Sequence, residues 1–250
     1  MSEKGICRKS VVPIRTAPSH DAAMVSQLLF GEHYEVIERV DEWLHIRLYF
    51  DHSQGWIHGH GHNMISEDYF NQINLSDYKV CTDISGTIFF QKKHVHILLG
   101  SILPITTNEL FKMEEQIAFN GESKSLSARR EFEFFKETVR KFNHAPYLKG
   151  GRTPFGVDDG GFLQQLYRIN GYQVPRSIDQ VKKAARPFDG SCDPGDIVIL
   201  HSDQAFAILD DGYMAGMLDG EVQRVKIEEI KDRIALKRPV LQKTASADAA

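Results

Sequence analysis

A glycine-rich approach to an apolar helix constrains the fold of this chain more than any other stretch. The approach covers residues 145–161 and ends in Asp158-Asp159-Gly160-Gly161. The apolar residues of the segment that follows have the spacing of one buried helical face: Phe162, Leu163, Leu166, Tyr167 and Ile169. The first turn of such a helix offers free backbone N–H groups and the positive end of the helix dipole. We therefore expect a turn-to-helix junction with Asp159 at the helix cap, where a carboxylate contributes ~1 kcal/mol.

The whole segment resembles the active-site segment of the NlpC/P60 cysteine peptidases, which cut the stem peptides of bacterial peptidoglycan. The resemblance is carried by Ala145-Pro-Tyr-Leu-Lys-Gly-Gly-Arg-Thr-Pro-Phe-Gly-Val-Asp-Asp-Gly-Gly-Phe162. In that family a cysteine, held as a thiolate by the helix start, follows the aspartate. The cysteine position is Asp159 in this chain. The resemblance thus implies a papain-like domain whose nucleophile has been replaced by a carboxylate, which is a poor nucleophile toward an amide.

The other two catalytic positions of the family are also changed. The landmark Pro194-Gly-Asp-Ile-Val-Ile-Leu200 is present, and the strand Gln204-Ala-Phe-Ala-Ile-Leu209 follows it. The resemblance places Gln204 at the catalytic base, and glutamine cannot take up a proton at any useful pH. It places Ala215, within one residue, where a polar side chain orients the base. Nucleophile, base and orienting residue are therefore all replaced.

The resemblance also implies ligand-binding positions, which are kept unevenly. The aspartate that holds the free amine of an N-terminal L-Ala is retained as Asp158, and a tyrosine that lines the cleft is retained as Tyr147. A tryptophan of the pattern is Lys149. The predicted ligand-binding set is Tyr147, Asp158, Asp159, Gly160 and Ile178, of which Gly160 and Ile178 stand where the family has serines. The retained side chains either recognise a peptide or only pack and cap.

Three substitutes for the lost catalytic groups need weighing. Cys192 lies in a loop that is remote from the helix start in the family fold. His201 lies three residues before Gln204 and is close enough in sequence to reach the same region. Asp158 with Asp159 offers two carboxylates, but neighbours at a helix start point in different directions. We favour none of the three over a non-catalytic site.

A metal or cofactor is not predicted. His58, His60 and His62 alternate with glycine, so they would share one side of an extended segment. No cysteine or carboxylate completes a ligand shell, and a solvated, glycine-rich exit from the preceding strands is the better interpretation.

Short strands fill the first part of the chain. Apolar stretches between turn signals predict a small barrel from the ranges 10–18, 24–32, 34–38, 43–48 and 54–57. Their order resembles the bacterial SH3 domains attached to NlpC/P60 enzymes, in which this domain closes one end of the cleft. A weaker second copy is expected over residues 78–118. Its expected strands are 87–90 and 94–99, and a landmark at Gly100-Ser-Ile-Leu-Pro104 is followed by the segment 111–113.

The predicted fold class is α+β, with two SH3-like barrels followed by a papain-like domain. The expected parts are residues 1–67 and 68–125 for the barrels, 126–243 for the NlpC/P60-like domain and 244–250 for a low-complexity tail. A helix over 127–142 opens the third part, with Phe132, Phe135, Val139 and Phe142 on its apolar face.

Composition excludes several partner classes. A net charge of −4 over 250 residues leaves no basic footprint for nucleic acid. No stretch reaches membrane-spanning length, and the first residues have no apolar run of a signal peptide. We expect a cytoplasmic protein, with export possible if a signal has been removed. Three cysteines far apart favour no disulfide framework.

These observations predict a non-catalytic relative of the murein peptidases that recycle γ-D-glutamyl peptides. Its expected partner is a cell-wall-derived peptide with a free N-terminal amine, or a protein. The alternative is an active hydrolase of murein peptides that uses an unusual constellation such as Asp159 with His201.

Overall fold

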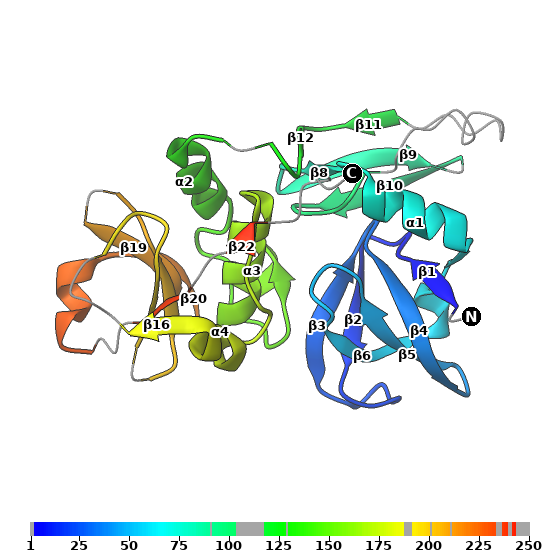
Figure 1. Cartoon of the computed structure of the whole chain (residues 1–250), viewed down its shortest axis with the longest axis horizontal. Helices are drawn as coiled ribbons and strands as arrows, with labels where there is room; N and C mark the ends of the chain where they lie inside the picture. Colours follow the sequence, from blue (N-terminus) through cyan, green and yellow to red (C-terminus); the bar gives the residue numbers. More distant parts are fainter. Residues whose placement is uncertain are drawn as a thin grey trace. The chain divides into compact units, whose positions relative to one another are not determined.

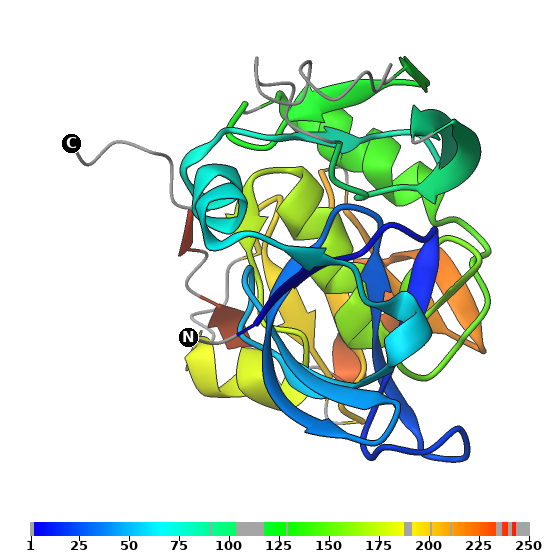
Figure 2. The same cartoon turned by 90° about the vertical axis from the view of Figure 1, so that its right-hand side faces the viewer.

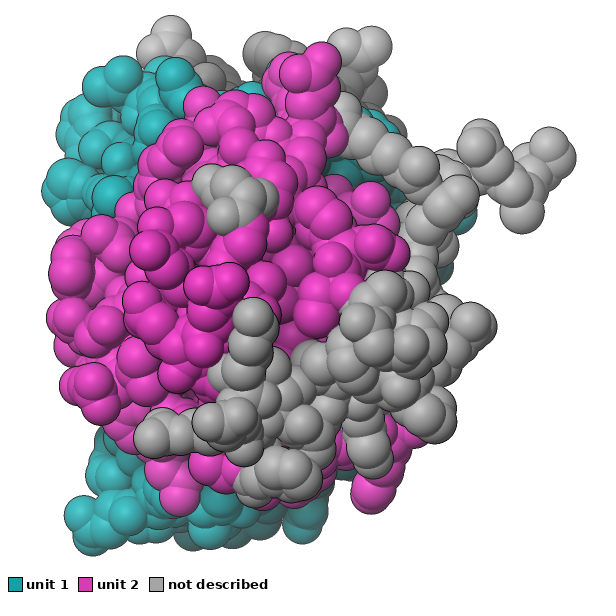
Figure 3. Space-filling view, turned by 90° about the vertical axis from the view of Figure 1, so that its left-hand side faces the viewer, with its two compact units in different colours: residues 1–128, 245–250 teal, residues 129–244 magenta. Residues whose placement is uncertain are grey.

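The computed structural model describes residues 3–90, 92–103, 118–128, 130–187, 192–200, 202–210, 212–233, 237–239 and 242–243. Contacts divide the chain into residues 1–128, with 245–250, and residues 129–244, which we call unit 1 and unit 2 (Figure 3). His201, Pro104, the segment 111–113 and the expected tail at 244–250 lie outside the described residues.

The first half of unit 1 is one antiparallel sheet of seven strands in the order β3-β2-β6-β5-β4-β1-β7. Its strands curl around an apolar interior (Figures 1 and 2). Alternating side chains fill that interior, among them Leu28, Leu44 and Ile46, none of which is exposed. The strands are β1 (Lys4–Ile6), β2 (Val11–Arg15), β3 (Met24–Leu29), β4 (His33–Val40), β5 (Trp43–Leu48), β6 (Gln54–His58) and β7 (Met64–Ile65). The five strands expected for the first barrel are therefore confirmed.

The second half of unit 1 shares its core with the first. Phe30 follows β3 and packs with Cys81, Ile88 and Ile97 in one buried cluster. Gly31, at φ +80°, allows the close approach, because a Cβ there would lie 2.1 Å from the Ile102 carbonyl oxygen. The elements are helix α1 (Glu67–Leu75) and strands β8 (Lys79–Cys81), β9 (Ser85–Phe90), β10 (Lys93–Leu98), β11 (Ala118–Asn120) and β12 (Ser123–Ser125). They form a β10-β9-β11 sheet and a β12-β8 pair, so a complete second barrel stays a prediction.

Unit 2 places a buried helix beside an antiparallel sheet in the order β17-β18-β19-β20 (Figure 1). The helix is α3 (Asp159–Ile169), whose residues 160–169 are all buried. Aromatic rings fix α2 (Phe132–Lys141) against it: Phe142 meets Phe162 at 5.4 Å between centroids, and Phe135 meets Tyr167 at 5.2 Å. The sheet strands are β17 (Ile197–Ile199), β18 (Ala205–Ile208), β19 (Tyr213–Leu218) and β20 (Glu221–Lys226).

Shorter elements complete unit 2 around α3. They are α4 (Ile178–Ala184), the 3-10 helix η3 (Ile227–Arg233), and the strands β13 (Arg152–Thr153), β14 (Gly156–Val157), β15 (Tyr172–Gln173), β16 (Ala185–Pro187), β21 (Lys237–Pro239) and β22 (Gln242–Lys243). The strands pair as β13-β14, β15-β22 and β16-β21. The turn before β17 is tied to α3, because the Tyr167 hydroxyl donates to the Gly195 carbonyl oxygen at 2.8 Å.

One local expectation was wrong. The helix expected over 127–142 begins only at Phe132, because Glu131 is extended and Ala128 is bonded back to Ser125 instead. The segment of alternating histidines, which would share one side only if it were extended, contains a turn of 3-10 helix, η1 (Gly59–Gly61). In the described part of the chain no helix is long and apolar enough to cross a membrane.

Candidate functional site

Asp158, not Asp159, caps helix α3. Its backbone is extended, with φ −103° and ψ 173°, and its Oδ1 accepts from the Gly161 N–H at 2.8 Å. Its Oδ2 accepts from the Gly150 N–H at 2.7 Å. The expectation that Asp159 caps the helix was therefore wrong by one residue. The reason is that the side chain before the first helical residue is the one that reaches the free N–H groups of the first turn.

Arg176 forms a bidentate ion pair with the Asp158 carboxylate. Its two terminal nitrogens donate to Asp158, Nη1 to Oδ1 at 2.8 Å and Nη2 to Oδ2 at 3.0 Å. The side chains are only 11% and 18% exposed, for Arg176 and Asp158 respectively. A carboxylate has about four acceptor directions, and four donors already use those of Asp158. Its negative charge is thus balanced within the chain.

Gly160 is required by the close approach of the Arg176 backbone. A Cβ at Gly160 would lie 2.1 Å from the Arg176 carbonyl oxygen, and one at Gly161 would lie 2.0 Å from the Gly151 carbonyl oxygen. Distances below 3.0 Å force something to move, and here the neighbour is backbone. The serine of the family pattern therefore has no room at Gly160 in this chain.

Asp159 is the first residue of α3 and faces the start of β18. Its Oδ1 lies 3.5 Å from the Ala205 backbone nitrogen, which donates to it. Burial raises the pKa of the Asp159 carboxyl above its ordinary value, and the charge of neighbouring Asp158 acts in the same direction. Asp159, which stands where the family has its nucleophile, thus lies next to β18, the strand that follows the position of the family's base.

Gln204 holds its own side chain by hydrogen bonds to the sheet. Its Nε2 donates to the Met217 carbonyl oxygen at 3.2 Å, and its Oε1 accepts from the Ser202 hydroxyl at 3.0 Å. Ala215 is fully buried and is paired with Ala207 across β18 and β19. Its methyl group cannot form a hydrogen bond that would orient a catalytic base. The geometry brings Asp159 close to the start of β18, where neither Gln204 nor Ala205 has a side chain that takes up a proton.

The remaining predicted ligand residues lie at the surface near the helix start. Tyr147 is 51% exposed and is bridged to Val157, while Ile178 is half-buried at the first position of α4. Leu148 and Phe155 are also exposed, at 42% and 63%, and belong to the same segment of residues 146–157. Sequence reasoning missed this apolar group and the role of Arg176. The Pro-Arg pair after α3 was a visible signal for the latter.

The thiols of this chain do not form part of this site. Cys192, the only cysteine of residues 129–244, packs against the cluster that contains Val198, Phe206 and Ile208. Cys7 and Cys81 are buried in unit 1, where burial raises the pKa of the Cys7 thiol to about 12.

The described histidines near carboxylates form pairs and no metal centre. His58 pairs with Glu42 at 3.3 Å, whereas His62 contacts Glu3 at 2.7 Å. Over the described residues, no three His, Cys, Asp or Glu side chains gather closely enough to hold a metal ion.

Comparison with known proteins agrees with the strand pattern of unit 1. Residues 14–60 match the family model described as the bacterial dipeptidyl-peptidase SH3 domain. A gamma-D-glutamyl-L-lysine dipeptidyl-peptidase of Bacillus subtilis (strain 168) is 28% identical over 102 residues. That alignment covers 38% of this chain and only 34% of the relative's length.

Solved structures resemble nearly the whole chain at low identity. An NlpC/P60 family protein from Bacillus cereus ATCC 10987 has a TM-score of 0.79 at 15% identity, covering 96% of this chain and 100% of its own. A structure described as a novel NlpC/P60 endopeptidase from Photobacterium damselae subsp. piscicida has a TM-score of 0.66 at 14% identity, covering 96% and 70%. The chain therefore carries a bacterial SH3 domain of the dipeptidyl-peptidase type and has the fold of NlpC/P60 family proteins.

Proposed function

We propose that unit 2 is a catalytically inactive NlpC/P60-like domain that recognises a peptide derived from the bacterial cell wall. The observation that carries the proposal is the carboxylate of Asp159 at the start of α3, next to Ala205, the first residue of β18, which Gln204 precedes. A thiolate attacks an amide carbonyl after a base has removed its proton, and neither group is present at these two positions.

The environment of Asp159 supports a site that binds a ligand and does not cleave amide bonds. The carboxyl is partly buried, its pKa is raised by burial, and the hydrogen bond that it accepts from the Ala205 N–H is long, at 3.5 Å. Such a group forms hydrogen bonds to a ligand in either protonation state, as acceptor or as donor. It does not form an acyl intermediate with an amide.

The apolar group formed by Tyr147, Leu148 and Phe155 supports binding. Three large side chains exposed within one short segment offer a contact surface for the apolar parts of a peptide. The name of the dipeptidyl-peptidase relative suggests the class of ligand, a peptide with a γ-D-glutamyl linkage. A protein partner on the same surface is the other form of this proposal.

Binding of a free amine by Asp158 would require the loss of hydrogen bonds that its carboxylate already accepts. An amine would compete with Arg176, Gly150 and Gly161 for acceptor directions that are already used. We propose that Asp158 mainly maintains the helix start, so that an amine is not required for binding.

Calorimetry on the full chain tests the proposal. Peptides containing L-Ala-γ-D-Glu, with a free or an acetylated N-terminus, should bind without being cleaved, and Tyr147→Ser with Leu148→Ser should weaken binding. Leu75→Ser, at an exposed leucine of unit 1, serves as the matched control. Mass spectrometry of the recovered peptide detects cleavage. Absence of heat with every peptide, or cleavage that iodoacetamide stops, contradicts the proposal.

An active hydrolase is the second candidate, and the raised pKa of Asp159 is the observation that favours it. Carboxyl groups with raised pKa values serve as general acids or bases in many active sites. In this candidate Asp159 would act with His201. Cleavage that Asp159→Asn abolishes would favour it, whereas uncleaved peptide in the mass spectrum favours the binding role.

A further inference from the structure

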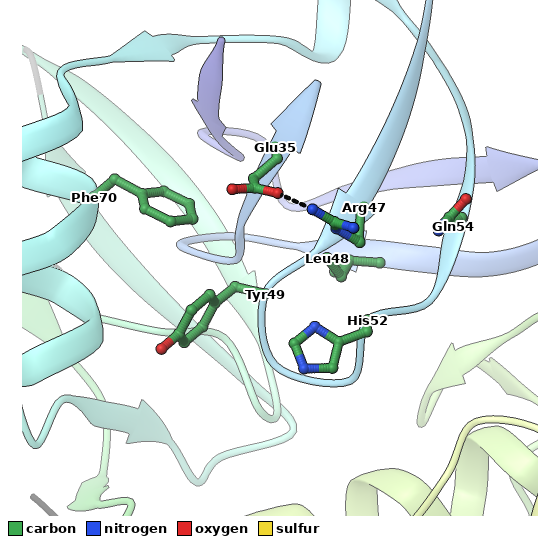
Figure 4. A pocket seen from close by; sticks show the side chains of 7 residues that line it. All are labelled: Glu35, Arg47, Leu48, Tyr49, His52, Gln54 and Phe70. Atoms are coloured by element: carbon green, nitrogen blue, oxygen red, sulfur yellow. Dashed lines mark hydrogen bonds and ion pairs between the residues drawn. The ribbon is translucent and has the colours of Figure 1, made fainter. Parts of the chain in front are cut away.

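A pocket of about 480 Å³ lies in unit 1, far in sequence from α3. It is bounded by strands β4 and β5, the turn between β5 and β6, and helix α1 (Figure 4). The lining residues are Glu35, Arg47, Leu48, Tyr49, His52, Gln54 and Phe70. Its volume lies in the range of pockets that hold small molecules or the end of a peptide, roughly 300–1,000 Å³.

One side of this pocket is an aromatic wall that is fixed in place. Tyr49 is 41% exposed, and its ring stacks on His33 at 5.1 Å and meets the edge of Phe70 at 5.6 Å between centroids. His33 is held in turn by Asn74 of α1, with Nε2 and Oδ1 2.6 Å apart. The exposed face of Tyr49 is thus preorganised for an apolar group.

The charges of the pocket favour an anion. Glu35 is the only acidic residue in the lining, and it is paired with both Lys4, at 2.5 Å, and Arg47. The hydrogen bond from Lys4, followed by that from Arg47, lowers the pKa of the Glu35 carboxyl, so it stays ionised at neutral pH. Two cations and one anion leave this group with a net positive charge. A cationic ligand would meet no free acid in the lining.

Hydrogen-bond donors lie opposite the aromatic wall. Figure 4 shows Tyr49 and Phe70 on one side of Leu48 and Gln54 on the other, with Arg47 above Leu48 and His52 below it. The Arg47 side chain remains 47% exposed despite its bond to Glu35. Nearby Asp51 is turned to its own loop, where Oδ1 accepts from the Ser53 N–H at 3.0 Å and from its hydroxyl at 2.7 Å.

We infer that this pocket binds a carboxylate that carries an adjacent apolar group, such as the C-terminal end of a peptide. Arg47, with Gln54 and His52, would receive the carboxylate, and the Tyr49 ring would cover the apolar group. Every residue in the lining belongs to unit 1, so this inference does not rest on the proposed function of unit 2.

Titration of the ¹⁵N-labelled full chain by NMR tests this inference. The probes are N-acetyl-Leu-Ala as the free acid, the same dipeptide as its C-terminal amide, and phenylacetate as a small acid without a peptide bond. The acid should shift the amide signals of residues 48–54 and bind about ten- to a hundredfold more tightly than the amide, since one charge-assisted contact distinguishes them. Binding of the dipeptide acid alone identifies a peptide end as the ligand. Binding of phenylacetate as well identifies a small free acid, and either result supports the site.

Variants locate the contact. Arg47→Gln should remove the difference between acid and amide, Arg47→Lys should keep part of it, and Tyr49→Ala should weaken both probes. Arg39→Gln is the matched control, because Arg39 is an exposed arginine of the same sheet that pairs with Glu3 and does not line the pocket. Equal binding of acid and amide, shifts confined to other residues, or no shifts at millimolar probe would overturn the inference. An Arg39→Gln effect as large as that of Arg47→Gln would also overturn it.

Discussion

Arg176 donates hydrogen bonds from both terminal nitrogens to the Asp158 carboxylate, at 2.8 Å and 3.0 Å. The carbonyl oxygen of Arg176 also lies in the space that a side chain at Gly160 would need. Arg176 therefore blocks two positions, Asp158 and Gly160, that the family resemblance assigns to ligand binding. The helix start is maintained by contacts within the chain, and each of these contacts can be tested.

Loss of the arginine should destabilise unit 2. Arg176→Ala leaves a largely buried carboxylate without its charge partner, so we expect unfolding to become easier by ~3 kcal/mol. Urea denaturation at neutral pH measures the change. Lys182→Ala is the control, because its partner Asp203 is 66% exposed and such pairs contribute less than ~1 kcal/mol. Equal effects of the two substitutions would show that the Arg176 pair has no special weight.

A side chain at position 160 should not be tolerated. Gly160→Ser and Gly160→Ala place the same Cβ against the Arg176 carbonyl oxygen, and we expect both to destabilise the protein by about 1–3 kcal/mol. Thermal unfolding compares the two. Destabilisation by alanine but not by serine would mean that the hydroxyl finds a partner that the steric argument omits.

The raised pKa of Asp159 predicts a specific dependence of stability on pH. A group whose pKa is higher in the folded than in the unfolded protein binds its proton more tightly when folded. Its contribution is fully present below the ordinary value of 3.8 and is lost as the pH rises through the folded pKa. Asp159→Asn should therefore be more stable than the parent at neutral pH, and the difference should vanish below pH 3.8.

Denaturation curves across this pH range provide the measurement. Asp21→Asn in the exposed turn of unit 1 serves as the control and should leave the curves unchanged. A parent protein that is more stable than Asp159→Asn at neutral pH would show that the carboxylate has a favourable partner.

Restoring the thiol alone should not restore catalysis. In Asp159→Cys the new thiol faces Ala205 and Gln204, and neither can take its proton, so we expect no turnover of L-Ala-γ-D-Glu peptides. Alkylation rates measured against pH report whether the helix start lowers the thiol pKa. Asp159→Cys with Gln204→His is the comparison, since it supplies thiol and base together. Robust turnover by the single variant would point to His201 as an existing base.

The local patterns of the sequence were sufficient for the elements that surround the site. Alternation of apolar residues located the strands at 43–48 and 54–58, and helical spacing located α3, because these periodicities depend only on neighbours along the chain. The expected start of α2 was wrong, and apolar spacing did not predict the 3-10 turn at Gly59–Gly61. In both places backbone hydrogen bonds to nearby residues, not apolar spacing, decide the conformation.

The sequence alone determined the side chains at the three positions that the resemblance assigns to catalysis. They are a carboxylate at 159, an amide at 204 and a methyl group at 215, which exclude thiolate chemistry at these positions wherever the chain places them. Only the tertiary structure decided how the neighbouring groups are used. Arg176 and Asp158 are separated by the whole of α3, and their bidentate contact forms because the chain returns across the helix start. The packing that excludes a Cβ at Gly160 arises from the same return of the chain, whereas Asp159, whose pKa burial raises, contacts Ala205 of β18. No local pattern encodes such contacts, because they depend on how distant segments meet.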